Sequence, residues 1–164
     1  MLKKTLIAYA SKTGSTQEIA NYMGHMLQEK GQEVVILPVK SVADISQYNS
    51  IILGSAIRIG KLLPEAMAFV ENNLAELKKK KFGVFIVCMT LNEDTMENRK
   101  IVSDYLNPLR AIIKPDSEGF FAGKIDFRRL KLLEKLIVKA LKVPEGDYRK
   151  WDQIDAWSGN LFLN

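Results

Sequence analysis

The feature that most constrains this chain is a regular alternation of short apolar runs with longer segments of helical period. The runs are rich in β-branched and aromatic residues and read as strands buried on both faces. They occupy residues 5–10, 34–39, 51–54, 82–88 and 120–122. Between and after them, helical periodicity predicts helices over residues 15–30, 63–77, 95–109 and 152–162.

Strands that alternate with helices predict an α/β protein whose parallel sheet is covered by helices on both faces. Right-handed crossovers then favour a three-layer, doubly wound sheet of five strands in the order 2-1-3-4-5. In such a sheet, ligands bind at the carboxyl ends of the strands, where the strand order reverses. The loops after the first, third and fourth strands are therefore the candidate site.

Composition excludes several classes of site. The 164 residues include one cysteine, Cys88, and one histidine, His25, so a disulfide and the usual zinc ligand sets are excluded. We expect Cys88 to be a buried thiol and His25 to lie on the surface. The most apolar run is about half the ~20 residues of a membrane-spanning helix, and no signal peptide is evident. The sequence predicts a single cytoplasmic domain over residues 1–164.

A loop rich in hydroxyl groups follows the first strand and leads directly into the first helix. Amide groups, hydroxyls and the helix dipole together favour a bound phosphate. Serine and threonine are also ordinary helix caps, so a simply capped helix is the alternative. Neither G-x-x-x-x-G-K-[ST] nor G-x-G-x-x-G is present, which argues against nucleotidases and dinucleotide binding. The candidate phosphate ligands are Ser11, Lys12, Thr13, Gly14, Ser15 and Thr16.

This Ser-x-Thr-Gly-x-Thr loop resembles the phosphate loop of flavodoxins, which implies a flavodoxin-like fold and noncovalent flavin mononucleotide (FMN). The stretch from Gly54 to Gly60 resembles one branch of that family, the menaquinone-dependent protoporphyrinogen IX dehydrogenases. The segment Trp151-Asp152-Gln153-Ile154 also resembles that branch. Likeness covers nearly the whole chain and is weakest between residues 92 and 119.

The resemblance implies that two further loops hold the flavin ring. Ile57 and Ile59 are candidates for one wall, and Met89 or Leu91 for the other. Arg58 is expected either to place positive charge near the flavin or to form a surface ion pair with Glu93 or Asp94. The full candidate set is Ser55, Ala56, Ile57, Arg58, Ile59 and Gly60 in one loop, and Met89, Thr90, Leu91 and Asn92 in the other.

Neither ring loop contains an aromatic residue, and the chain carries a net charge of +5. Electron-carrier flavodoxins instead have an aromatic residue on the flavin and an acidic surface, so two-electron chemistry is favoured. We expect an FMN-dependent oxidoreductase that moves electrons between a protoporphyrinogen-like organic donor and a quinone-type acceptor, with no residue assigned as acid or base. The alternatives are a flavodoxin electron carrier that docks a redox partner protein and a binding module without catalysis.

The positive charge is concentrated in one segment, residues 124–146, which we call the basic insertion. Residues 124–142 contain seven basic and two acidic side chains, a surplus equal to the net charge of the whole chain. Helical spacing predicts an amphipathic helix over residues 127–143. Three interpretations stay open: a helix packed on its own domain, peripheral contact with an anionic membrane, or nucleic-acid binding, the last the weakest. The candidate membrane contacts are Arg128, Arg129, Lys131, Lys135 and Lys139.

Overall fold

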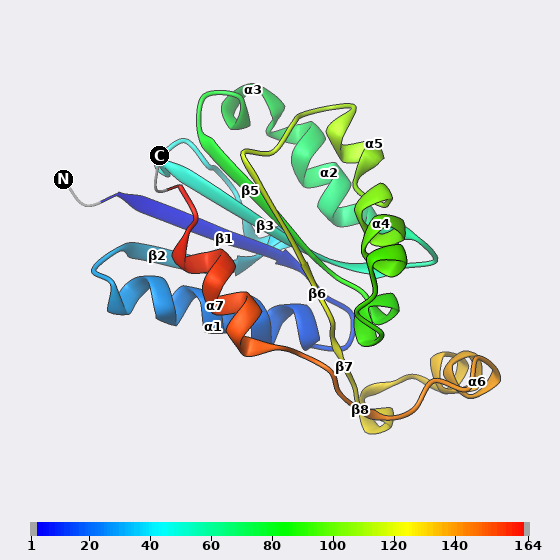
Figure 1. Cartoon of the computed structure of the whole chain (residues 1–164). Helices are drawn as coiled ribbons and strands as arrows, with labels where there is room; N and C mark the ends of the chain where they lie inside the picture. The colour runs from blue at the N-terminus through cyan, green and yellow to red at the C-terminus, as the bar shows by residue number, and fades with distance from the viewer. Residues whose placement is uncertain (1–2, 163–164) are drawn as a thin grey trace.

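A computed structural model, which describes residues 3–162, confirms the α/β architecture (Figure 1). Five parallel strands form the sheet in the order β2-β1-β3-β5-β6, which is the predicted order 2-1-3-4-5. A two-residue strand, β4 (Lys61–Leu62), pairs antiparallel with the end of β3. The parallel strands are β1 (Lys4–Ala10), β2 (Glu33–Pro38), β3 (Ser50–Arg58), β5 (Lys81–Val87) and β6 (Ser117–Phe121).

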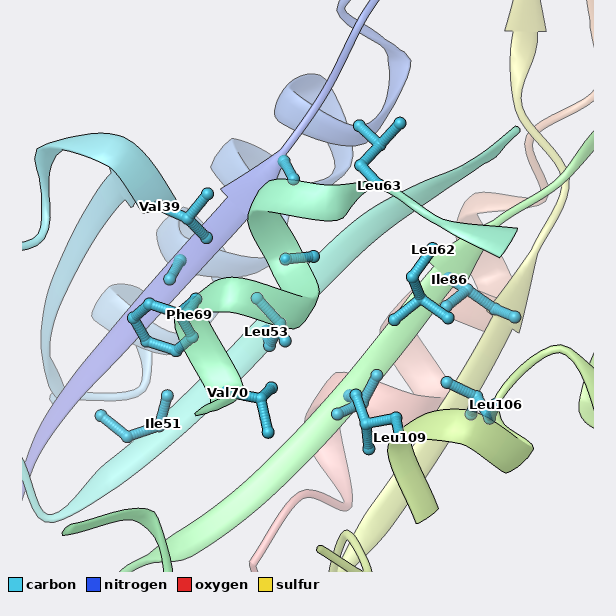
Figure 2. Close-up of a cluster of buried hydrophobic side chains, with 14 of the residues drawn as sticks. Val39, Ile51, Leu53, Leu62, Leu63, Phe69, Val70, Ile86, Leu106 and Leu109 are labelled. Carbon is cyan, nitrogen blue, oxygen red and sulfur yellow. The ribbon is translucent and has the colours of Figure 1, made fainter. Parts of the chain in front are cut away.

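Helices cover both faces of the sheet. On one face lie α1 (Ser15–Glu29) and α7 (Trp151–Gly159), whose buried residues pack with Ile7, Ile52 and Phe85. The other face carries a larger cluster, shown in Figure 2, in which Phe69, Val70 and Leu109 pack on the strands. The helices of that layer are α2 (Pro64–Asn72), α3 (Leu74–Leu77), α4 (Met96–Asp104) and α5 (Asn107–Arg110).

The register of the sheet brings the loops that follow β1, β3 and β5 to one edge. Ala10, the last residue of β1, pairs with Ser55, and the neighbouring Ala56 pairs with Val87 at the end of β5. Parallel pairing forces these strand ends to the same side, so the three candidate loops are neighbours.

The aromatic residues near the C-terminus anchor α7, as expected. Trp157 packs edge-on against Phe85 and Phe121, with ring centroids 6.1 and 5.8 Å apart. Trp151 packs on Tyr22 of α1 at 4.5 Å. The structure also confirms that Cys88 is buried and that His25 is exposed.

Two expected helices are each divided in two. The helix expected over residues 63–77 is interrupted at Asn73, whose side-chain amide donates to the Phe69 carbonyl at 2.8 Å and caps α2. The helix expected over residues 95–109 is interrupted between α4 and α5. Pro108 lies in the first turn of α5, and because it lacks an amide hydrogen it cannot donate to the carbonyl of Asp104 as a continuous helix would require.

The continuous helix expected over residues 127–143 is wrong. The basic insertion begins with β7 (Lys124–Ile125) and a 3₁₀ turn over Phe127–Arg129, continues into α6 (Leu132–Ala140) and returns through β8 (Gly146–Asp147). The Asp126 carboxylate accepts the Arg128 amide at 3.0 Å and starts the 3₁₀ turn, whereas Glu134 accepts the Lys131 amide at 3.0 Å and starts α6. A 3₁₀ turn and a separate short helix, each with its own N-terminal cap, therefore stand in place of one long helix.

The interpretation in which this helix packs its apolar face on its own domain is also wrong. Of the apolar residues of α6, only Val138 is buried. Exposed side chains, with 51–77% of their surface accessible, are those of Leu132, Leu133, Leu136, Ile137 and Leu141. Figure 1 shows α6 standing off from the sheet, beyond the paired β7 and β8.

Within residues 3–162, no helix is both long enough and apolar enough to cross a membrane.

Candidate functional site

The loop after β1 presents the start of α1 without a side-chain cap among the described residues. Gly14 is the residue before the helix and has a φ of 95°, a left-handed conformation that glycine adopts without strain. The Ser11 hydroxyl accepts the Gly14 amide at 3.2 Å and so holds the loop rather than the helix. The hydroxyl-rich loop therefore does not act as the ordinary helix cap that was the alternative.

The predicted phosphate ligands are brought together around this helix start. Ser15 and Thr16 are buried, Ser11, Thr13 and Gly14 are half-buried, and Lys12 is exposed. A hollow of about 340 Å³ opens beside the loop. It is lined by Ser11, Lys12 and Gly14 together with Lys40 and Glu65 from neighbouring segments.

The loop after β3 is a tight β-hairpin rather than an open loop. The pair Arg58 and Lys61 closes a turn of two residues, Ile59 and Gly60, which have φ values of 51° and 67°. Positive φ at both positions is typical of the type I′ turn and is strained for a β-branched residue. The Ile59 side chain is 99% exposed, so no packing within the described chain explains the strain. Backbone strain of this kind gathers at functional sites.

The other predicted residues of this hairpin have different environments. Ser55 is fully buried, and its hydroxyl donates to the Ala56 carbonyl and accepts the Leu63 amide at 3.1 Å. Ile57 is half-buried and packs on the core. The Arg58 Nη1 atom lies 3.8 Å from the Glu134 Oε1 atom of α6. Arg58 therefore pairs with Glu134 and not with Glu93 or Asp94, the expected alternatives.

The loop after β5 is a 3₁₀ turn over Met89–Asn92. Leu91 is buried in the core, which leaves the half-exposed Met89 as the candidate for the second wall. Asn98 donates to the Thr90 carbonyl at 3.1 Å. The Asn92 side-chain oxygen is buried and has no hydrogen-bond partner in residues 3–162. An unsatisfied buried acceptor costs free energy, and a ligand N–H would remove that cost.

A second hollow, of about 440 Å³, lies between this turn and the end of the basic insertion. Tyr148 lines it, so an aromatic residue reaches the ring loops although neither loop contains one. Nothing in the sequence near residues 89–92 signals this contact, because it depends on how the insertion returns to the sheet. The lining includes Met89, Thr90, Asn92, Leu141, Val143 and Tyr148.

The basic insertion contacts two loops of the candidate site and borders the third. Its first residue, Lys124, donates its amide to the Ser15 hydroxyl at 3.0 Å. Glu134 reaches Arg58 on the hairpin, and residues 141–144 line the second hollow. The insertion is therefore part of the candidate site.

Charge pairs fix the far side of the third loop. Asp94 accepts hydrogen bonds from Arg99, from Lys150 at 3.1 Å and from Gln153. These bonds, that from Arg99 foremost, hold the pKa of Asp94 well below its usual range. The carboxylate thus ties the segment after the 3₁₀ turn to the start of α7.

Comparison with known proteins now places the chain in a family. The model of the flavodoxin domain matches residues 6–152. The chain belongs to the flavodoxin family. It is accordingly a flavoprotein, and its cofactor is noncovalent FMN.

Individual flavodoxin-family relatives agree with this assignment. The chain is 22% identical to protoporphyrinogen IX dehydrogenase [quinone] of Escherichia coli K12, over 92% of this chain and 90% of that protein. A Streptococcus pneumoniae flavodoxin structure is 25% identical, with a TM-score of 0.53, over 85% of this chain and 99% of that one. Flavodoxin 1 of Bacillus cereus has the same TM-score at 18% identity and covers 87% of this chain and 100% of its own.

The strained hairpin gives a stability prediction. Replacing Ile59 by Asn should raise the free energy of unfolding by about 1 kcal/mol, because Asn tolerates the left-handed conformation and precedes Gly60 in the favoured Asn-Gly turn. Urea unfolding of the flavin-free protein measures the change. Ile59→Val, which keeps a β-branched side chain at the same positive φ, is the control and should gain nothing. A loss of stability in Ile59→Asn would show that the turn is not strained.

Proposed function

We propose that this protein is an FMN-dependent oxidoreductase that passes two electrons at a time from an organic donor to a quinone-type acceptor. The observation that carries the proposal is the sheet edge itself. There, the uncapped start of α1 lies beside an apolar hairpin tip and beside a turn with an unsatisfied buried acceptor. FMN needs three such environments. The helix start suits its phosphate, the hairpin tip suits its flat apolar ring, and the unsatisfied acceptor suits the polar edge of that ring.

In this proposal, the loop of residues 11–16 binds the FMN phosphate through its amides and hydroxyls. The hairpin bearing Ile57 and Ile59 and the side chain of Met89 flank the isoalloxazine ring. Asn92 presents its free oxygen to the polar edge of the ring. The flavin supplies the redox chemistry, and these residues supply its position and surroundings.

Local charge favours two-electron chemistry. Arg58 is only loosely paired, at 3.8 Å from Glu134, and Lys142 lines the second hollow. Positive charge stabilises a fully reduced, anionic cofactor and so supports transfer of electrons in pairs. Because Tyr148 lies beside the third loop, the lack of an aromatic residue no longer favours two-electron chemistry, whereas the positive charge still does.

The relative from E. coli supports the substrate classes, since its name specifies a protoporphyrinogen and a quinone. Per turnover, the donor would lose two electrons and two protons, and the quinone would gain the same to become a quinol. The 440 Å³ hollow beside Met89 and Tyr148 offers an apolar and aromatic wall for either molecule.

A one-electron carrier that docks an acidic partner protein is the second candidate function. The flavodoxin structures that resemble this chain and the exposed lysines of the basic insertion favour it. In that case, electrons would pass singly, and the colour of the half-reduced flavin would distinguish the two functions.

We also propose that α6 docks on an anionic membrane surface, where a lipophilic quinone dissolves. Its exposed leucines lie on one side of the helix, and helical spacing places Lys135 and Lys139 along the border of that side. An apolar face bordered by lysines suits the interface of a membrane with anionic headgroups.

Turnover tests the oxidoreductase proposal. Under anaerobic conditions, FMN-loaded protein should convert protoporphyrinogen IX into the fluorescent porphyrin when menadione is supplied as acceptor. Thr13→Glu places a carboxylate in the phosphate loop and should weaken FMN binding at least about a hundredfold through like-charge repulsion, with loss of turnover. Stoichiometric FMN without turnover of this donor or of other reduced tetrapyrroles would contradict the proposal.

Cosedimentation tests the membrane proposal. The protein should bind vesicles of phosphatidylcholine with 30% phosphatidylglycerol and bind vesicles of phosphatidylcholine alone more weakly. Changing Leu132, Leu136 and Ile137 together to Gln should reduce binding at least about tenfold, because the apolar contact is lost. Met96→Gln, at an exposed apolar residue of α4, is the matched control and should bind as the wild type does. Equal binding of the triple variant would refute the docking face.

A further inference from the structure

Arg129, from the 3₁₀ turn of the basic insertion, lies directly against the loop proposed to bind phosphate. A Cβ atom added to Gly14 would stand 3.0 Å from the Arg129 Nη1 atom. The same Nη1 donates to the Glu18 carboxylate at 2.7 Å. The guanidinium thus lies between Gly14, the residue before α1, and Glu18 in the first turn of that helix.

This position is fixed by contacts at the base of the insertion. The Lys124 amide is bonded to the Ser15 hydroxyl, and Gly123 approaches so closely that a Cβ there would lie 3.1 Å from that oxygen. The buried Asp126 starts the 3₁₀ turn and lies 3.9 Å from the Arg129 Nε atom. These contacts hold the 3₁₀ turn that bears Arg129 in a defined position next to the loop.

The Glu18 carboxylate places negative charge near the loop, and two arginines compensate for it. Its carboxylate lies one turn from the loop and would repel a phosphate dianion. Burial raises the pKa of Glu18, but hydrogen bonds from Arg129 and Arg149 outweigh this and lower it, so the carboxylate stays charged. Positive charge placed between this carboxylate and the loop would offset the repulsion of a bound phosphate.

Of the two arginines that bind Glu18, Arg129 is the one with N–H groups still available to a ligand. The Arg149 side chain is 7% exposed, is bonded to both Glu18 and Asp147, and stacks over Trp151 with its guanidinium carbon 4.7 Å from the ring centre. The Arg129 side chain is 43% exposed, and its hydrogen bond to Glu18 uses one of five N–H groups. Nε faces Asp126 at 3.9 Å, whereas Nη2 makes no hydrogen bond within residues 3–162 and can donate to an anion.

We propose that Arg129 is an additional ligand of the flavin phosphate, bridging it to Glu18 and closing the basic insertion over the cofactor. The proposal rests on the placement of the FMN phosphate at residues 11–16. A guanidinium suits this role because its planar set of donors can hold a carboxylate and a phosphate at once. Flavin binding and the position of the insertion are then coupled.

Binding of FMN and riboflavin to the flavin-free protein separates the phosphate from the ring. Quenching of flavin fluorescence measures both affinities in the wild type, in Arg129→Ala and in the control Arg128→Ala. Arg128 comes from the same turn, bonds Asp126 and is almost fully exposed. Arg129→Ala should weaken FMN binding about tenfold or more and leave riboflavin binding unchanged, whereas Arg128→Ala should change neither. Arg129→Lys, which keeps the charge but loses the planar donors, should fall between.

Two results would overturn the inference. Unchanged FMN affinity in Arg129→Ala would show that the arginine does not touch the phosphate. Equal weakening of FMN and riboflavin would show that Arg129 only holds the insertion in place. Failure of the placement itself is distinguishable, because the wild type would then bind riboflavin as tightly as FMN.

Discussion

The parallel register of β1, β3 and β5 is the constraint on which the rest of the site depends. Because Ala10 pairs with Ser55 and Ala56 pairs with Val87, the chain must leave all three strands at one edge. The start of α1, the strained hairpin and the 3₁₀ turn are neighbours for this reason alone. The hydrogen bond from Lys124 to Ser15 then fastens the basic insertion across the same edge. Cofactor loops and insertion thereby form one unit.

Much of the fold is readable from sequence because local pattern and burial agree there. Strands buried on both faces appear as apolar runs, and their alternation with helices leaves one common strand order. The phosphate loop is readable for a similar reason, since its residues are contiguous and the helix start is local. Asn73 and Pro108 are local signals for the two helix interruptions, but the apolar periodicity on either side of them favours continuous helices.

The features that the sequence does not reveal depend on contacts between distant segments. Tyr148 lies beside the third loop only because the insertion folds back over the sheet edge. For the same reason, Arg58 pairs with Glu134 and not with Glu93 or Asp94. The left-handed Ile59 was unreadable because a β-branched residue ordinarily argues against that conformation. The sequence does not reveal that the α6 leucines are exposed, because an amphipathic pattern shows that a helix has an apolar face but not whether that face packs on the domain.

An anaerobic reductive titration of the FMN-loaded protein with dithionite, followed in the visible spectrum, tests two-electron chemistry most directly. If electrons move in pairs beside Arg58, the yellow oxidised flavin passes to the colourless reduced form with little coloured radical at the midpoint. A long-lived blue radical that accumulates near the midpoint would contradict it and make the protein a one-electron carrier.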